Sequence, residues 1–261
     1  MDVYWFEQTQ ADVPDADDWL SANETQFLSR LHFPKRRADW LLGRWTAKNA
    51  LVSCLGLPSE LQMLRAIEIR ASPSGAPEAF LGNQSTKTTL SLSHRAGTGA
   101  CAVVPSRVTL GCDLEWIEPR SNAFASDYFV AEEQALIANA AAENRNLLLA
   151  LLWSAKESAL KALREGLRWD TRSVIVSLPN TPKICGVPPE FSGQSSFSDR
   201  SLSESEANHW KQFDVRTMDG KRLCGWWTES GGLLRTLVAA PPPNPPFLLS
   251  RACFAAQGRK S

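Results

Sequence analysis

The chain has 261 residues, and its 28 lysines and arginines are balanced by 28 aspartates and glutamates, so the formal net charge is zero. Zero net charge argues against a protein that binds nucleic acid through bulk positive charge, and 43% hydrophobic residues are typical of a globular protein with a substantial core. The longest apolar run, residues 147–153, is much shorter than the roughly 18 residues of a membrane-spanning helix. We expect neither a nucleic acid nor a membrane as a partner.

The first residues and the cysteines indicate the cellular compartment of the protein. The sequence opens on acidic and aromatic residues, MDVYWFEQ, where a secretory signal peptide would be basic. The six cysteines include no CxxC pair, and no histidine stands at metal-ligand spacing from them, which argues against a disulfide framework and against a zinc site. We therefore expect a cytoplasmic protein.

The elements expected in the first part of the chain are short and of both kinds. Apolar periodicity predicts one helix from near Asp17 and a second over 36–55, which stops at Gly56. Strands and turns follow from apolar runs, alternation and clusters of glycine and proline. We expect strands at 3–6, 66–70, 88–92 and 99–104, a turn at 72–77 and a loop at 93–97.

The second part of the chain shows the same mixture. We expect helices at 131–142 and 146–164, and strands at 108–116, 173–178, 211–217, 222–228 and 233–240. Residues 185–207 are rich in serine, proline and glycine, which predicts a mobile insertion. The proline-rich stretch from Pro241 predicts a disordered tail that leaves the fold. No short internal repeat is evident. We expect three parts in the chain, namely a first half at 1–106, a second half at 107–240 and a tail at 241–261.

The segment Leu110-Gly-Cys-Asp-Leu-Glu-Trp116 is the first with chemical content. Strand alternation places the apolar residues on one face and Asp113 and Glu115 together on the other. Two neighbouring carboxylates repel each other unless a cation lies between them, and such hard oxygen ligands suit Mg²⁺, which keeps positions for phosphate oxygens and water. A solvated strand face is the simpler interpretation of this motif by itself.

A second segment, Trp153-Ser-Ala-Lys-Glu-Ser-Ala-Leu-Lys161, lies on a predicted helix. Its polar stripe contains Glu157 and Lys161, which are i,i+4 neighbours in the favourable order. The simpler interpretation is therefore an ion pair that stabilises the helix surface. The functional interpretation pairs a carboxylate that binds metal or accepts a proton with an ammonium group that steadies phosphate charge.

Basic residues gather on the helix predicted at 36–55. Arg37, Arg44 and Lys48 are spaced by seven and four, so they can share a face, which suits either a phosphate group or solvent. His94 lies in the predicted loop between two strands, and a lone histidine is more often structural than catalytic. The chain has no Walker A, G-x-G-x-x-G, G-x-S-x-G or kinase motifs, so nucleotide-fold and serine-hydrolase interpretations lose their main support.

In combination these motifs resemble a known family. The 4′-phosphopantetheinyl transferases of the Sfp type have a similar succession of motifs, which here reads Gly43-Arg44, Gly75-Ala-Pro77, Ser91-Leu-Ser-His94, Gly111-Cys-Asp-Leu-Glu115 and Trp153-Ser-Ala-Lys-Glu-Ser-Ala-Leu-Lys161. The last two motifs, G-x-D-x-E and W-S-x-K-E-x-x-x-K, are specific as a pair. The resemblance runs from about residue 30 to residue 178.

The resemblance implies a fold and a reaction. The fold would be α/β (α+β), with two similar subdomains related by a pseudo-twofold and the active site between them. Residues 1–106 would bind the phosphates of coenzyme A, and 107–240 would hold the metal and the catalytic groups. Such enzymes use Mg²⁺ and move 4′-phosphopantetheine from coenzyme A to a serine of an acyl or peptidyl carrier protein, releasing adenosine 3′,5′-bisphosphate. We expect a monomer, because two halves in one chain provide the interface that smaller relatives build by oligomerising.

The resemblance also assigns residue roles by position. Asp113, Glu115 and Glu157 would hold Mg²⁺ together with the pyrophosphate. Glu157 would also take the proton from the carrier serine, and Lys161 would neutralise charge on the leaving group. The contacts with coenzyme A would come from Arg37, Arg44, Lys48, Gly75, Pro77, Ser93, His94 and Lys161. Among these, Arg44 with Arg37 or Lys48 would hold the 3′-phosphate.

One cation of the family pattern is missing. Many members have Gly-Lys-Pro where this chain has Ala76 in the middle position, and we hypothesise that Arg95 supplies the charge. We also expect the carrier protein to dock along 119–133 through exposed aromatic residues such as Phe124, Tyr128 and Phe129, for which core packing is the alternative.

Two rival functions stay open at this point. One is a different Mg²⁺-dependent enzyme that cleaves a pyrophosphate with water as the nucleophile. The other is a catalytically silent relative that only binds coenzyme A or a carrier protein. The sequence does not indicate which carrier or pathway would be served.

Overall fold

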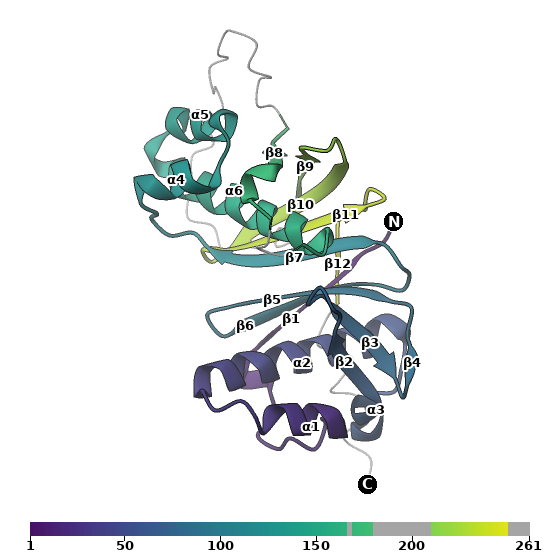
Figure 1. Cartoon of the computed structure of the whole chain (residues 1–261). Coiled ribbons are helices and arrows are strands. Elements are labelled where there is room, and N and C mark those ends of the chain that lie inside the picture. Colours follow the sequence, from purple (N-terminus) through teal and green to yellow (C-terminus); the bar gives the residue numbers. More distant parts are fainter. Residues whose placement is uncertain (166–168, 180–209, 250–261) are drawn as a thin grey trace, which may run out of the picture.

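The computed structural model describes residues 1–165, 169–179 and 210–249 and has two halves stacked on each other (Figure 1). The first half comprises β1 (Tyr4–Thr9), η1 (Gln10–Asp12), α1 (Ala22–Leu28), α2 (Pro34–Leu55), α3 (Leu61–Ala66), β2 (Ile67–Ala71), β3 (Pro77–Leu81), β4 (Gln84–Ser85), β5 (Thr89–Arg95) and β6 (Thr98–Val104). The second comprises β7 (Thr109–Trp116), α4 (Asn122–Tyr128), α5 (Ala131–Asn139), α6 (Ala142–Ala162), η3 (Thr171–Ser173), β8 (Val174–Ser177), β9 (Lys211–Thr217), β10 (Arg222–Ser230) and β11 (Leu233–Ala240).

The strands form three sheets. The first half has a sheet in the order β12-β1-β6-β5, where β12 (Phe247–Leu248) comes from the end of the described chain, and a small sheet β2-β3-β4. The second half has one sheet in the order β7-β11-β10-β9-β8. The α+β fold class predicted from the sequence is therefore confirmed. No helix in the described ranges is long and apolar enough to cross a membrane.

The two large sheets pack against each other and each carries a long helix on its outer face (Figure 1). Between the sheets lies a core with residues from both halves, including Trp5 and Ala102 from one and Leu114 and Leu237 from the other. A second core lies under α2 and a third under α6. Because the central core is shared, the two halves form one packed body.

The long helix of the first half, α2, begins and ends within two residues of the predicted range, 36–55. Pro34 occupies the first turn, where its missing N–H costs nothing, and Gly56 ends the helix with a φ of 61°, a conformation that favours glycine. The helix predicted from near Asp17 instead begins at Ala22. Ser21 caps that helix, accepting the Glu24 backbone N–H while the Glu24 side chain accepts the Ser21 N–H.

Hydroxyl groups on β5 join the two halves. Thr89, Ser91 and Ser93 are alternate residues of β5, so their side chains point to the same side. Their oxygens accept the backbone N–H groups of Val108, Cys112 and Leu114 at 3.0, 2.9 and 3.1 Å. The edge of β7 is thus satisfied by side chains. The predicted loop at 93–97 is wrong for its first half, because Ser93 to Arg95 continue the strand and the turn consists of Ala96 and Gly97.

A buried ion pair recurs in both halves. In the first, Lys48 of α2 lies 2.6 Å from Glu24 of α1, and Glu24 also accepts the backbone N–H of Ile69. In the second, Lys156 of α6 lies 2.8 Å from Glu133 of α5. Glu133 likewise accepts the N–H of Val176, a residue of β8. The same kind of buried pair thus joins two helices in each half.

The sequence around the two lysines repeats as well. Trp45-Thr-Ala-Lys48 on α2 corresponds to Trp153-Ser-Ala-Lys156 on α6. The sequence therefore does hold a short internal repeat, contrary to the expectation, since tryptophan, alanine and lysine recur and Thr46 is replaced by Ser154.

The end of the described chain returns to its beginning. Strand β12 pairs in parallel with β1, and the backbone N–H groups of Phe247 and Leu249 donate to the carbonyls of Val3 and Trp5 at 2.9 and 2.8 Å. The prediction that the chain leaves the fold at Pro241 is therefore wrong for residues 241–249. The predicted insertion at 185–207 lies outside the described residues, as do residues 250–261 of the predicted tail.

Candidate active site

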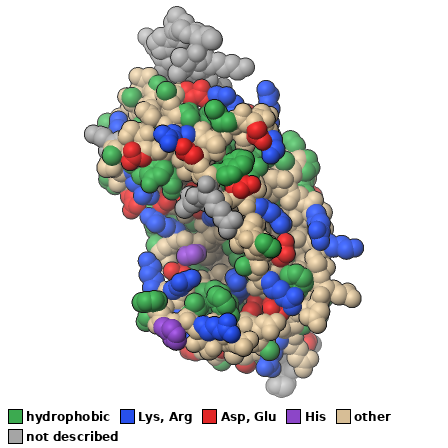
Figure 2. All heavy atoms as spheres, in the orientation of Figure 1, with side chains coloured by type: hydrophobic (Ala, Val, Ile, Leu, Met, Phe, Trp, Pro, Cys, Tyr) green, Lys and Arg blue, Asp and Glu red, His purple; other side chains and the backbone are tan. Residues whose placement is uncertain are grey.

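A cavity of about 720 Å³ lies between the two halves. The hollow is visible in Figure 2, with lysine, arginine and histidine side chains around it. Its walls come from α2, the β2–β3 turn and β5 on one side, and from the start of β7 and the end of α6 on the other. Six cations line it, namely Lys35, Arg36, Arg44, Arg70, Lys161 and Arg164. A cavity with this lining suits an anionic ligand with several charges.

Carboxylates lie directly beside this cavity. Asp113 and Glu115 project from β7 toward α6 and are almost fully buried. They can approach the helix because Gly111 on the same face has no side chain, and a Cβ there would lie 1.9 Å from the Ser158 carbonyl oxygen. The predicted placement of both carboxylates on one strand face thus agrees with the structure.

Asp113 is held by three donors from two elements, β5 and α6. Its Oδ1 accepts bonds from Ser93 on β5 and Lys161 on α6, both at 2.8 Å, and its Oδ2 accepts one from Ser154 at 2.8 Å. The Ser154 hydroxyl also meets the Thr236 hydroxyl at 2.8 Å. These contacts fix the carboxylate at the boundary between the halves.

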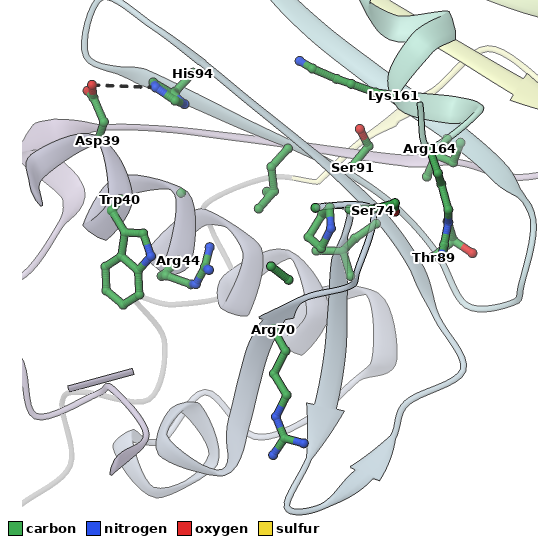
Figure 3. Close-up of a pocket in the computed structure, with 18 of the residues that line it drawn as sticks. Asp39, Trp40, Arg44, Arg70, Ser74, Thr89, Ser91, His94, Lys161 and Arg164 are labelled. Carbon is green, nitrogen blue, oxygen red and sulfur yellow. Dashed lines mark ion pairs between the residues drawn. The ribbon is translucent and has the colours of Figure 1, made fainter. Parts of the chain in front are cut away.

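Lys161 connects the carboxylates with the cavity. Its Nζ bonds Asp113, the Cys112 carbonyl at 3.0 Å and the Ser93 hydroxyl at 3.2 Å, while its side chain lines the cavity (Figure 3). Burial lowers the pKa of Lys161, but the charge and hydrogen bond of Asp113, together with the neighbouring Cys112 and Glu157, outweigh it and the pKa is raised. The lysine therefore stays positively charged where it faces a ligand.

Glu157, one turn before Lys161 on α6, is half-buried in the same cluster. Burial, followed by the neighbouring charge of Asp113, raises the pKa of Glu157 to about 7. Lys161 lowers it only in part. A carboxyl group with this pKa can accept a proton near neutral pH, which is the property of a general base.

Glu115 faces a different set of partners. Its Oε1 lies 3.0 Å from Arg95 and 3.2 Å from Arg120, and accepts the Trp116 backbone N–H at 2.9 Å. Burial raises the pKa of Glu115, and the charge of Arg95 opposes this. Among the described residues, no three histidine, cysteine, aspartate or glutamate side chains converge into a formed metal site.

The side chain of Arg44 is less exposed than that of Lys161, at 18% against 32%. Its guanidinium lies 4.8 Å from the ring centre of Trp40 (Figure 3) and its Nε lies 3.9 Å from a Glu24 oxygen. Its Nε and the Nε1 of Trp40 are buried with no hydrogen-bond partner in the described structure. Burial lowers the pKa of Arg44, and Glu24 offsets this only in part. A buried guanidinium without a full set of partners favours an incoming anion.

His94, Gly75 and Pro77 line the cavity, as the predicted contacts with coenzyme A require. The Nε2 of His94 lies 3.7 Å from Asp39 on α2 (Figure 3). Ser93 does not line the cavity and instead contacts Asp113 and Lys161 behind the wall. Four lining cations were not among the predicted contacts, namely Lys35, Arg36, Arg70 and Arg164. Arg164 continues the polar stripe of Glu157 and Lys161, whereas Arg70 lies outside the motifs and the sequence offered no signal for it.

Two predicted contacts lie elsewhere. Lys48 has no exposed surface, and its Nζ donates to the carbonyls of Trp19 and Leu64 as well as pairing with Glu24. It is therefore part of the core and its predicted role as a phosphate ligand is wrong. Arg37 pairs with Asp17 at 2.9 Å and does not line the cavity.

Two further expectations differ from the structure. Arg95 contacts Glu115 and Glu118, away from the turn at Ala76, so it does not supply the missing cation there. Phe129 is 1% exposed and packs in the core under α6, which makes the alternative of core packing the correct one for it. Tyr128 is 38% exposed and forms an aromatic cluster with Phe124 and Trp153.

Two comparisons with known proteins show which proteins this chain is similar to. Residues 109–217 fit the model of the 4′-phosphopantetheinyl transferase superfamily. The chain is also 27% identical over 191 residues to the 4′-phosphopantetheinyl transferase HetI of Nostoc sp. strain PCC 7120, and the alignment covers 71% of this chain and 77% of that protein. The segment that fits the family model contains Asp113, Glu115, Glu157 and Lys161.

Proposed function

Because the chain belongs to the 4′-phosphopantetheinyl transferase superfamily, we propose that it transfers 4′-phosphopantetheine from coenzyme A to a serine of an acyl or peptidyl carrier protein. The observation that carries this proposal is the position of Lys161. Its side chain lines the cationic cavity while its ammonium group bonds Asp113, so the cavity and the carboxylates form one site.

The cavity wall supports coenzyme A as the donor. Coenzyme A carries a pyrophosphate and a 3′-phosphate, and the wall offers several cations at separate positions. Arg44, with its unpartnered buried Nε, would hold one phosphate together with Arg36 and His94. The turn at Gly75 and Pro77 would lie against the nucleotide.

Asp113, Glu115 and Glu157 fit Mg²⁺ in their donor chemistry, because they offer hard oxygen atoms. The charges of Asp113 and Glu115 each raise the pKa of Glu157, so the three carboxylates are close enough to repel one another without a cation. These three residues would hold the ion. A bound Mg²⁺ would neutralise charge on the pyrophosphate oxygens.

The residues of this chain would then divide the reaction between them. A bond forms between the serine oxygen and the phosphorus that carries pantetheine, and the bond from that phosphorus to the bridging oxygen breaks. Glu157 takes the proton of the serine hydroxyl, for which its raised pKa suits it. Lys161 faces the cavity and neutralises charge on the leaving adenosine 3′,5′-bisphosphate.

We further propose that the enzyme is of the Sfp type and acts as a cytoplasmic monomer. The buried ion pair that recurs on α2 and α6 supports a protein with two related halves. Because one chain provides both walls of the cavity, no second copy is required to complete the site.

The test is the intact mass of an apo-carrier protein after incubation with this protein, coenzyme A and Mg²⁺. We expect a gain of one phosphopantetheine group, which is lost with Glu157→Gln and with a chelator. Glu143→Gln, an exposed position on the same helix, is the matched control and should transfer normally. Release of free phosphopantetheine would instead indicate attack by water. Binding of coenzyme A with no transfer to carriers of several pathways would indicate a silent relative.

A further inference from the structure

Two arginines hold Glu115 from outside the carboxylate cluster. Arg95 contributes its Nε at 3.0 Å and Arg120 an Nη2 at 3.2 Å, both to the same oxygen, Oε1. That oxygen also accepts the Trp116 backbone N–H at 2.9 Å. Three donors on one carboxylate oxygen saturate its lone pairs.

A second carboxylate fixes the arginines themselves. Glu118 lies 2.9 Å from the Nη2 of Arg95 and 3.2 Å from the Nη2 of Arg120, so two carboxylates and two guanidinium groups form a closed network. The Arg120 guanidinium also lies 5.1 Å from the ring centre of Phe124. Arg95 comes from β5 of the first half and Arg120 from the segment after β7, which makes the network a contact between the halves.

Glu115 therefore differs from the other two carboxylates. Asp113 points to Lys161 and the serines, and Glu157 lies beside Asp113, whose charge raises its pKa. Arg95 and Arg120 hold the Oε1 of Glu115. A divalent cation shared by the three carboxylates would draw on the charge of Glu115, which the two arginines already neutralise.

We propose that Arg95 and Arg120 compete with the divalent cation for Glu115, so that these two positioning residues set the metal affinity of the site. The proposal rests on the proposed function, since it presumes that Glu115 is a metal ligand. The two guanidinium groups neutralise Glu115 while no ion is bound. An ion that binds Glu115 meets a carboxylate whose charge is already shared with both guanidinium groups, so the attraction between Glu115 and the ion is weakened.

The test is a titration of the purified protein with Mn²⁺ at pH 8 in the absence of coenzyme A, with free Mn²⁺ measured by electron paramagnetic resonance. We expect Arg95→Gln and Arg120→Gln each to tighten Mn²⁺ binding roughly three- to tenfold. Arg95→Lys keeps a positive charge but loses the fork that spans Glu115 and Glu118, and should tighten binding less. Arg172→Gln, an exposed arginine paired with Asp170, is the control and should leave the affinity unchanged.

A double substitution separates competition from general charge repulsion. In a Glu115→Gln background, Arg95→Gln should no longer tighten Mn²⁺ binding, because the contested ligand is gone. Equal tightening in that background would overturn the proposal, as would weaker or unchanged binding in either single arginine variant. A circular dichroism spectrum of each variant excludes loss of the fold as the cause.

The titration also separates this inference from the proposed function. If the wild-type protein binds Mn²⁺ and transfers phosphopantetheine, yet the arginine variants bind no more tightly, only the inference fails. If neither wild type nor variants bind Mn²⁺, both the inference and the metal role of Glu115 fail. Binding that appears only in the arginine variants supports the inference most directly.

Discussion

Lys48 on α2 and Lys156 on α6 make corresponding contacts in the two halves of the protein. Each pairs with a glutamate from the preceding helix and donates to two backbone carbonyls, and each is fully buried. The residue that follows the lysine differs, being Asn49 on α2 and Glu157 on α6. Asn49 donates to the Trp45 carbonyl at 2.8 Å, whereas Glu157 belongs to the candidate site. The lysines are thus common scaffold, and of the two positions that follow them only the one on α6 carries a carboxylate.

The buried pairs should be needed for stability and not for substrate binding. Lys156→Met leaves the Glu133 charge buried without a partner and should lower the free energy of unfolding by about 3–5 kcal/mol. Lys48→Met should do the same through Glu24. Urea denaturation measures both, and adding Glu133→Leu to Lys156→Met should restore much of the loss. A loss below about 1 kcal/mol would show that the pair is not a structural requirement.

Arg44 and Arg37 provide a matched pair of arginines on one helix. Arg44→Gln removes a desolvated cation from the cavity wall and should raise the KM for coenzyme A roughly tenfold. Arg37→Gln should leave that KM unchanged, because Arg37 lies outside the cavity and pairs with Asp17. Steady-state kinetics with coenzyme A and with its 3′-dephospho form show which phosphate Arg44 contacts. If Arg44 holds the 3′-phosphate, the dephospho form should not distinguish Arg44→Gln from wild type.

Glu157 should make the protein less stable as the pH rises. Its pKa of about 7 in the folded protein exceeds its ordinary value of 4.5. Between these values the folded protein holds a proton that the unfolded chain has released, so the free energy of unfolding falls as pH rises through that window. In metal-free buffer at pH 8, Glu157→Gln should therefore gain on the order of 1–2 kcal/mol. Denaturation at pH 4 should show no gain, and an equal gain at both values would contradict the assignment.

Gly111 should tolerate no side chain. A Cβ at this position would lie 1.9 Å from the Ser158 carbonyl oxygen and 2.5 Å from the Ala162 nitrogen, both of them backbone atoms of α6. Gly111→Ala should therefore push α6 from the sheet and cost about 3 kcal/mol or more. At Gly43, in the interior of α2, an added Cβ meets nothing within 4 Å. Gly43→Ala should accordingly stabilise the protein by about 0.5–1 kcal/mol, and thermal unfolding compares the two.

The aromatic residues near the end of α4 should separate into docking and core positions. Tyr128 is partly exposed, and Tyr128→Ala should raise the KM for the carrier protein while the KM for coenzyme A stays the same. Phe129→Ala should instead cost about 3–5 kcal/mol of stability, because that side chain is buried. Kinetics and denaturation of both variants test this division. An unchanged carrier KM for Tyr128→Ala would place the docking surface elsewhere.

The sequence predicts best where local signals agree. Apolar periodicity and Gly56 predict α2 to within two residues of its ends, and strict alternation on β7 places Asp113 and Glu115 on one face. The polar stripe of α6 predicts Glu157 and Lys161 as neighbours. All of these depend on residues close together in the chain, for which periodicity is informative.

The sequence predicts poorly where a distant partner decides. Helical spacing places Lys48 with Arg44, but Glu24 on another helix provides a buried counter-charge and draws the lysine inward. His94 lies in β5 and not in a loop, because Ser93 to Arg95 pair with β6 and the Ser93 hydroxyl accepts the Leu114 N–H of β7. The repeat around Lys48 and Lys156 could have been found by aligning the chain with itself.

The pairing of β12 with β1 has a consequence for synthesis. Tyr4 leaves the ribosome early, but its partner Phe247 is among the last residues of the described chain to follow. At about 5–20 residues per second, the outer edge of β1 stays open for on the order of ten seconds or more. During that interval the nascent first half presents an unpaired strand edge, which other chains can extend. Translation of the second half therefore also ends the period in which the first can aggregate.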